Sequence, residues 1–184
     1  MTEPPVILLL SGSLRAGSSN EAVLRTARAV AAGSRTPLEA VLYEGLGELP
    51  HFNPDDDTDP LPAPVAALRA AVAGAAALLV CSPEYAGTLP GSFKNLLDWT
   101  VGGTEIGDKP VAWVNAAAPG RGDGASATLR TVLGYTGASV VEEACVRIPV
   151  SRDSIGPDGL LTSPEDRERL AGVLAVLLEA AKPA

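Results

Sequence analysis

A run of five apolar residues, Val6–Leu10, is followed at once by a loop rich in hydrogen-bond donors, Ser11–Asn20. The run is typical of a strand buried on both faces of a parallel sheet. Apolar residues at helical spacing come next, so the loop leaves the carboxyl end of a strand and enters a helix. Unpaired N–H groups, serine hydroxyls and the Arg15 guanidinium at that helix start predict a phosphate site. An ordinary serine-rich turn with a helix N-cap is the alternative.

The same order of strand, loop and helix recurs along the chain. Strands are expected at residues 6–10, 38–43, 76–81, 110–114 and 139–148. Polar side chains interrupt the last of these, which favours an edge strand. The final helix should begin with Ser163 as N-cap and Pro164 at its first position. Alternating buried strands and helices predict the α/β class, with a doubly wound parallel sheet in a single domain over residues 1–184.

Two loops should meet at one end of this sheet. In doubly wound sheets, ligands bind beyond the carboxyl ends of the strands, where the strand order reverses between the first strand and the third. The loops at that point are Ser11–Asn20 and Ser82–Gly91. The second loop offers backbone N–H groups, although a proline-bounded turn that holds Tyr85 against the core is the plainer interpretation. Together the loops predict a mononucleotide phosphate over the first and a planar group over the second.

No metal site is expected. Asp55, Asp57 and Asp59 imitate the start of a calcium loop, but Pro60 and Ala66 stand where glycine and glutamate are required. The two cysteines are isolated from each other in apolar runs, which is typical of buried thiols in a reducing compartment.

Hydrolysis and phosphoryl transfer also find little support. His51 is the single histidine and lies in an acidic loop, where it is expected to be an exposed residue rather than a catalyst. The chain contains neither a Gly-x-Ser-x-Gly elbow nor a Gly-x-x-x-x-Gly-Lys phosphate loop. Gly120–Gly124 nearly matches a dinucleotide fingerprint, but its third glycine comes one position early, so it is a weak candidate for a pyrophosphate cradle.

Charge and hydropathy restrict the partners. A net charge of −8 argues against nucleic acid, whose phosphates require a basic surface. No apolar run approaches the roughly 20 residues of a membrane span. Met1–Pro5 carries no basic residue and does not resemble the start of a secretory signal. These features predict a cytoplasmic protein that binds neither nucleic acid nor membrane.

Several motifs together resemble the NAD(P)H-dependent FMN reductase family, flavodoxin-like enzymes that include quinone, chromate and azo-dye reductases. The resemblance covers most of the chain. The specific motifs are Gly12–Arg15 with Ser19–Asn20, Pro83–Tyr85, Pro90–Gly91, Lys94–Asn95 and Asp98–Trp99. Softer matches are Leu49–Pro50 with Phe52–Asn53, and Lys109–Val111. The family implies a flavodoxin-like, five-stranded sheet of order 2-1-3-4-5, with helices on both faces.

The resemblance implies bound FMN, with NADPH or NADH as co-substrate. Four polar residues of the first loop would hold the phosphate, Pro83–Gly87 would line the isoalloxazine and ribityl, and the loop Ala116–Gly120 would close the other edge of the ring. The cofactor-binding residues implied are Ser11, Ser13, Leu14, Arg15, Ser19, Asn20, Pro83, Glu84, Tyr85, Ala86, Gly87, Ala117, Ala118 and Gly120. Ala86 departs from the family, which usually has asparagine there. Its loss leaves the acceptor preference and the affinity for FMN open.

The expected reaction is a ping-pong transfer, in which a nicotinamide gives hydride to the flavin and leaves before an acceptor arrives. A quinone, an azo compound, chromate or free flavin would then take the electrons. Because the flavin carries the chemistry, no catalytic side chain is expected. Glu84 is either a proton donor or, as we favour, a structural carboxylate that accepts backbone hydrogen bonds in its own turn.

Two alternatives to this enzyme remain at this point. One is a flavodoxin-like electron carrier that takes no hydride from a nicotinamide. The other is a relative that has lost flavin and serves as a binding module. Carriers usually clamp the flavin between aromatic side chains, and here only Tyr85 lies near the expected ring. The family also implies a homodimer or homotetramer, with the helix that contains Asn95–Trp99 as a candidate interface.

Overall fold

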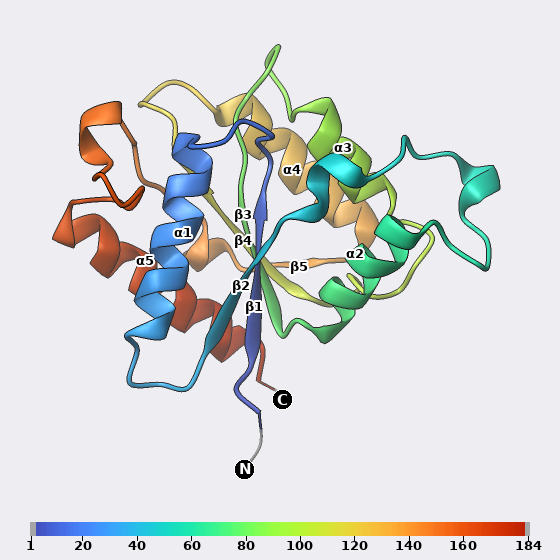
Figure 1. Cartoon of the computed structure of the whole chain (residues 1–184), viewed down its shortest axis with the longest axis horizontal. Coiled ribbons are helices and arrows are strands. Elements are labelled where there is room, and N and C mark those ends of the chain that lie inside the picture. Colours follow the sequence, from blue (N-terminus) through green and yellow to red (C-terminus); the bar gives the residue numbers. More distant parts are fainter. Residues whose placement is uncertain (1–2, 183–184) are drawn as a thin grey trace.

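The computed structural model describes residues 3–182, which form a twisted parallel sheet between two layers of helices (Figure 1). The strands are β1 (Val6–Ser11), β2 (Glu39–Tyr43), β3 (Ala77–Cys81), β4 (Pro110–Asn115), β5 (Ser139–Val140) and β6 (Val146–Arg147). The helices are α1 (Ser19–Ala32), α2 (Ala63–Gly74), α3 (Gly91–Asp98), α4 (Asp123–Thr136) and α5 (Pro164–Ala180). None of the helices within residues 3–182 is both long enough and apolar enough to cross a membrane.

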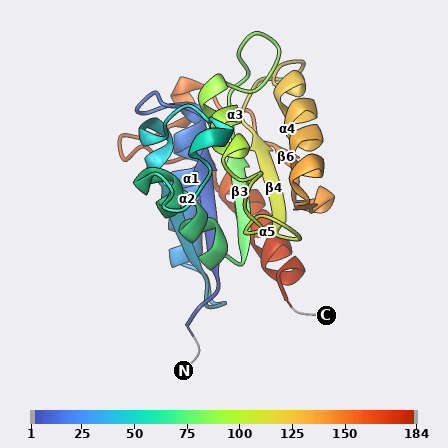
Figure 2. The ribbon, with the colours of Figure 1, turned by 90° about the vertical axis from the view of Figure 1, so that its right-hand side faces the viewer.

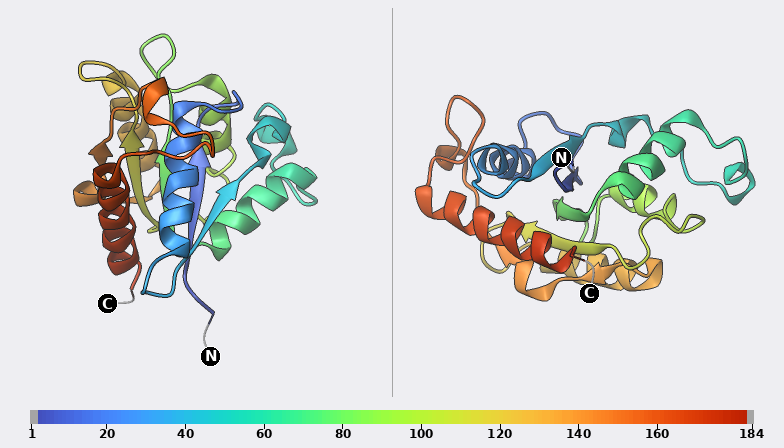
Figure 3. Two further views of the ribbon diagram at one scale, coloured as in Figure 1. Left: turned by 60° about the vertical axis from the view of Figure 1, so that its left-hand side comes forward. Right: turned by 90° about the horizontal axis from the view of Figure 1, so that it is seen from below.

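The strands are ordered β2-β1-β3-β4-β5, and β6 also pairs with β4. This confirms the expected doubly wound sheet and its strand order. Alternate residues of β1 serve opposite faces. Ile7 and Leu9 pack with α1 and α5, whereas Leu8 and Leu10 pack with α2, α3 and α4. The chain therefore has two cores, one on each side of the sheet, and α1 and α5 lie side by side over the first (Figure 3).

The fifth expected strand is interrupted. A single strand over 139–148 is wrong, because a 3-10 turn at Glu142–Ala144 separates β5 from β6, and both pieces pair in parallel with β4. The two adjacent glutamates, Glu142 and Glu143, favour a solvent-facing turn over a continuous ladder. β5 lies at the edge of the sheet, as its polar residues predicted.

The long loop after β2 is fixed to α3 by a small polar and aromatic cluster. The Asn95 side chain donates to the Pro50 carbonyl at 2.9 Å and accepts from the Phe52 N–H at 2.7 Å. The Trp99 indole N–H also donates to the Pro50 carbonyl, at 2.8 Å, and its ring meets Phe52 edge to face. Four motif residues far apart in the sequence thus share one role, which is to hold the loop 45–62 against the second core.

An ion pair fixes the far part of the same loop. Arg69 on α2 binds Asp57 at 2.7 Å and donates through Nε to the Trp99 carbonyl at 3.0 Å. Asp57, one of the three aspartates that imitate a calcium loop, therefore already has a cationic partner. The helix α3 ends at Asp98, so the Trp99 carbonyl that Arg69 binds lies directly after its last residue.

Thr26 connects α1 to the segment before α5. Its hydroxyl is fully buried, donates to the Ala22 carbonyl at 2.7 Å and accepts from the Leu161 N–H at 2.9 Å. We predict that Thr26→Val, which keeps the shape but removes the acceptor, lowers the free energy of unfolding by about 1–3 kcal/mol, because a buried N–H is left unpaired.

Urea denaturation measures this change. Thr131→Val is the matched control, because Thr131 also donates to a carbonyl four residues before it, at 3.1 Å, yet lies on the surface. Equal losses for the two variants would contradict a specific role of the Leu161 hydrogen bond.

Candidate functional site

Three loops gather at the carboxyl end of the sheet, after β1, β3 and β4 (Figures 1 and 2). The first two are in direct contact, since the Gly12 N–H donates to the Cys81 carbonyl at 2.9 Å. A Cβ atom at Gly12 would collide with Ser82 in both its side chain and its backbone. Glycine is therefore required where the two loops cross, and the expected convergence of the loops is what the structure has.

The loop after β1 is folded by its own hydroxyls. The Ser11 hydroxyl accepts from the Ser13 N–H at 3.2 Å and donates to the Ser13 carbonyl, and the Ser13 hydroxyl accepts from the Arg15 N–H at 3.2 Å. Ser11 is thus occupied within the turn, whereas the Ser13 hydroxyl still has a proton to donate. The Arg15 side chain is exposed and makes no hydrogen bond or ion pair within residues 3–182.

The amino terminus of α1 has donors to spare. The helix begins at Ser19, and Ser18 caps it by accepting from the Glu21 N–H. The N–H groups of Ser19 and Asn20 find no acceptor in the described part of the chain. Unpaired N–H groups at the positive end of a fourteen-residue helix favour an anion. The Asn20 side chain points elsewhere, because its oxygen accepts from the Cys81 thiol at 3.4 Å.

The loop after β3 carries a tight hairpin. The N–H and carbonyl groups of Tyr85 and Thr88 bond each other in both directions, at 3.0 and 3.1 Å. The two residues between them, Ala86 and Gly87, have φ of +51° and +78°. Two successive positive φ angles define a type I′ turn, for which Asn-Gly is among the preferred sequences. The backbone conformation therefore explains why the resembled family usually has asparagine at position 86. In this chain Ala86 occupies a conformation that disfavours alanine.

Glu84 joins this hairpin to α4. Its carboxylate accepts from the Ala125 N–H at 3.0 Å, and Gly124 leaves the space that the carboxylate and the Gly87 carbonyl occupy. Glu84 therefore accepts a backbone hydrogen bond, as expected of a structural carboxylate. Its partner, however, lies in α4 and not, as we had expected, in its own turn. The Glu84 carboxylate thus already caps the amino end of α4, which disfavours a pyrophosphate there.

A hollow of about 570 Å³ opens between the three loops. It brings together six of the expected cofactor-binding residues: Ser19, Asn20, Pro83, Glu84, Ala117 and Ala118. Ser11, Ser13, Leu14 and Arg15 line a separate hollow of about 260 Å³, on the side of the loop that faces Tyr43 and Leu46. Tyr85, Ala86, Gly87 and Gly120 line neither hollow and stand at the rim as exposed residues.

Four residues that line the larger hollow were not expected: Ser82, Arg121, Gly122 and Val150. Arg121 is the one cation among the residues that line it. The sequence does point to Arg121, because it is the one basic residue in the run of mostly small residues 116–124. Val150 comes from beyond β6 and gave no such signal.

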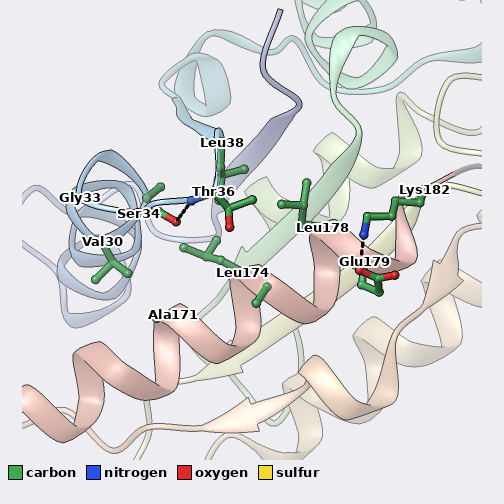
Figure 4. Close-up of a pocket in the computed structure, with 12 residues that line it drawn as sticks. Val30, Gly33, Ser34, Thr36, Leu38, Ala171, Leu174, Leu178, Glu179 and Lys182 are labelled. Atoms are coloured by element: carbon green, nitrogen blue, oxygen red, sulfur yellow. Dashed lines mark hydrogen bonds and ion pairs between the residues drawn. The ribbon is translucent and has the colours of Figure 1, made fainter. Parts of the chain in front are cut away.

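The remaining titratable groups stay outside this chemistry. Burial raises the pKa of the Cys81 thiol far above its usual range, so it remains a neutral donor to Asn20. His51 is exposed in the loop that precedes α2. No group of three or more His, Cys, Asp or Glu suited to a metal ion occurs within residues 3–182. A third hollow of about 440 Å³ lies between α1 and α5, is lined largely by apolar side chains, and shares no residue with the site (Figure 4).

The chain matches known proteins over nearly its whole length. The family model described as NADPH-dependent FMN reductase matches residues 5–152. An NAD(P)H:quinone oxidoreductase of Solanum tuberosum is 31% identical, over 96% of this chain and 94% of the relative. An NAD(P)H-dependent FMN reductase of Pseudomonas aeruginosa is 30% identical, over 96% and 95% of the two chains.

Solved structures agree with the fold. A flavoenzyme NAD(P)H:(acceptor) oxidoreductase of Paracoccus denitrificans superposes with a TM-score of 0.80 at 27% identity, covering 96% of this chain and 97% of that one. A flavodoxin of Bacillus cereus, at 14% identity, gives a TM-score of 0.58 over 95% and 97% of the two chains. The second likeness supports the flavodoxin-like fold alone.

The hairpin makes a prediction about Ala86. Ala86→Asn should raise the free energy of unfolding by up to about 1 kcal/mol, because a left-handed conformation costs alanine roughly 1–2 kcal/mol and asparagine tolerates it better. Chemical denaturation of the protein without added flavin reports the change. Ala16→Asn, in an exposed turn without positive φ, is the control and should not stabilise. A destabilised Ala86→Asn variant would show that the turn does not govern this position.

Proposed function

The chain belongs to the NADPH-dependent FMN reductase family, and from that premise we propose that a quinone or a related small molecule is its electron acceptor. The family and the relatives confirm the expected activity, an NAD(P)H-dependent oxidoreductase that uses FMN as cofactor. FMN supplies the redox chemistry, since its ring accepts hydride from a nicotinamide and passes electrons on to the acceptor. The contribution of the protein is to bind and orient these molecules.

We propose that the phosphate of FMN binds at the start of α1. The observation that carries this proposal is the contrast between two helix amino termini at the same end of the sheet. The α1 terminus is capped by the neutral Ser18 hydroxyl, whereas the α4 terminus is capped by the Glu84 carboxylate, whose charge disfavours an anion. The Ser13 hydroxyl and the Arg15 guanidinium, which both line the smaller hollow, would complete the donor set by turning toward the helix start.

The flavin ring would then extend across the hollow of about 570 Å³ toward the loop after β4. Pro83 and Glu84 form one wall of this hollow, and Ala117 and Ala118 form the opposite one. The hairpin with Tyr85 stands at the rim and is more than half exposed. It leaves the outer side open to a second planar molecule, which suits an enzyme better than a carrier that clamps its flavin.

We propose three further features of the protein. The whole chain acts as one FMN-binding domain, it forms a homodimer or homotetramer, and it is located in the cytoplasm. Asn95 and Trp99, which are offered above as part of an interface, are engaged with the chain's own loop. The free thiols of Cys81 and Cys145 are in keeping with a reducing compartment such as the cytoplasm.

Anaerobic reduction of the purified protein tests the function. We expect the FMN-loaded protein to be bleached by NADPH or NADH and to recover its colour when a quinone is added. A protein that stays colourless with added FMN would contradict flavin binding altogether. A yellow protein that neither nicotinamide bleaches would instead support the electron carrier.

The phosphate site has its own test. We predict that Arg15→Ala weakens FMN binding by about 1.5–3 kcal/mol, as expected for a charge-assisted hydrogen bond to phosphate. Fluorescence titration with FMN measures the loss, and riboflavin, which lacks the phosphate, should bind both proteins equally. Arg28→Ala, an exposed arginine farther along α1, is the control. Unchanged FMN affinity in Arg15→Ala would place the phosphate elsewhere.

A further inference from the structure

The loop between β4 and α4, residues 116–122, forms one wall of the larger hollow but has no regular structure. It consists of small residues, one proline and Arg121, so its side chains offer little packing that would hold it in place. Inside the loop, the Arg121 N–H donates to the Ala118 carbonyl and the Ala117 N–H donates to Asn115. These few bonds leave several carbonyl groups that need a partner from elsewhere.

Arg147 is that partner. Its Nη1 atom lies 3.1 Å from the carbonyl oxygens of Ala117 and Ala118 and 2.6 Å from that of Arg121. Its Nη2 atom pairs with Asp123, the first residue of α4. One guanidinium thus gathers three carbonyl groups of the loop and the start of the following helix. The two separate Nη atoms of the planar guanidinium serve the carbonyl groups and the Asp123 carboxylate at the same time, which the single nitrogen of an ammonium group is not suited to do.

The base of this side chain is itself fixed. Arg147 belongs to β6 and pairs with Asn115, the last residue of β4. The next N–H, of Ile148, donates to the Asn115 carbonyl at 3.0 Å, and Arg169 on α5 donates to the Arg147 carbonyl at 2.6 Å. The side chain therefore reaches the loop from a backbone that is held on two sides.

The carbonyl groups of Ala117, Ala118 and Arg121 each accept a hydrogen bond from Arg147. The N–H groups of Ala118 and Gly120, by contrast, make no hydrogen bond to any acceptor in residues 3–182. The loop therefore has unpaired donors left for a bound molecule, while these three carbonyl groups already have a partner. Flavin carries several acceptor atoms on the polar edge of its ring, so a loop with spare donors suits it.

We propose that Arg147 is a positioning residue that holds the wall 116–122 in the conformation that receives the flavin ring. It does not touch the flavin, and the inference rests on the proposed function. Its action is confined to the ring end of the site, away from the phosphate at α1. Loss of Arg147 should consequently loosen the loop and weaken binding of the ring, whatever group the ribityl chain carries.

Hydrogen exchange of the flavin-free protein tests the first half. In Arg147→Gln, exchange of the two hydrogen-bonded loop amides, those of Ala117 and Arg121, should accelerate at least tenfold, while β1 and β3 keep their protection. Arg130→Gln is the matched control, because Arg130 forms an exposed ion pair with Glu142 in the same part of the molecule and makes no hydrogen bond or ion pair with the loop within residues 3–182. Its loop exchange should equal that of the wild type.

Titration with riboflavin and with FMN tests the second half. Arg147→Gln should weaken both ligands by the same factor, at least fivefold, whereas Arg15→Ala should weaken FMN alone. Arg147→Lys should recover part of the loss, because the single nitrogen of an ammonium cannot serve both the carbonyl groups and Asp123. A role in overall stability alone would lower the melting temperature and leave the affinity of the folded protein for riboflavin unchanged.

The outcomes separate the two proposals. A wild type that binds neither flavin overturns the proposed function and the ring-positioning role with it. A wild type that binds both, together with an Arg147→Gln variant that keeps wild-type loop exchange and riboflavin affinity, overturns the role of Arg147 alone. If Arg147→Gln does not fold, the same two measurements on Arg147→Lys decide, with smaller losses expected in both.

Discussion

The neighbouring positions of β1 and β3 determine where this molecule can bind a ligand. The two strands pair directly, yet the helices that follow them lie on opposite faces of the sheet, α1 with α5 and α3 with α2 and α4 (Figure 1). Their loops must therefore diverge from a common point, and Gly12 and Ser82 meet there. Such a point leaves a space beyond the strand ends that no side chain of the core fills. The proposed flavin site occupies that space.

Electrostatics determines which end of the site favours the phosphate of a bound molecule. The chain is acidic overall, and the two helix amino termini at this end differ in what they offer an anion. Glu84 reaches across to the start of α4, which both holds the hairpin and repels a phosphate from that helix. The start of α1, by contrast, is capped by the neutral Ser18 hydroxyl, and its Ser19 and Asn20 N–H groups are unpaired beside the hollow in the described part of the chain. A molecule with a phosphate at one end and a flat ring at the other thus has one orientation that satisfies both ends.

Much of the fold was predictable because its signals are local. Apolar runs such as Val6–Leu10 specify strands buried on both faces, and the capped start of α5 at Ser163 formed as expected. The loop Ser11–Asn20 could be recognised as a phosphate site from its hydrogen-bond donors, and its motif was among those that indicated the family. The family model matches residues 5–152, which include this strand and this loop but not α5.

Other features depend on contacts that sequence spacing does not encode. The break between β5 and β6 follows from a turn of two glutamates that also reads as an edge strand. The positive φ of Ala86 is visible only once the hairpin is built, since alanine itself gives no sign of it. Arg147 binds carbonyl groups some 26–30 residues away along the chain, and carbonyl groups leave no trace in a residue pattern.

A crystal structure of the protein with FMN tests the central claim most directly. The account predicts the phosphate within hydrogen-bond distance of the Ser19 and Asn20 N–H groups, and the ring in the hollow between Pro83 and Ala117. A phosphate bound at the start of α4, or a ring in the hollow between α1 and α5, would contradict it.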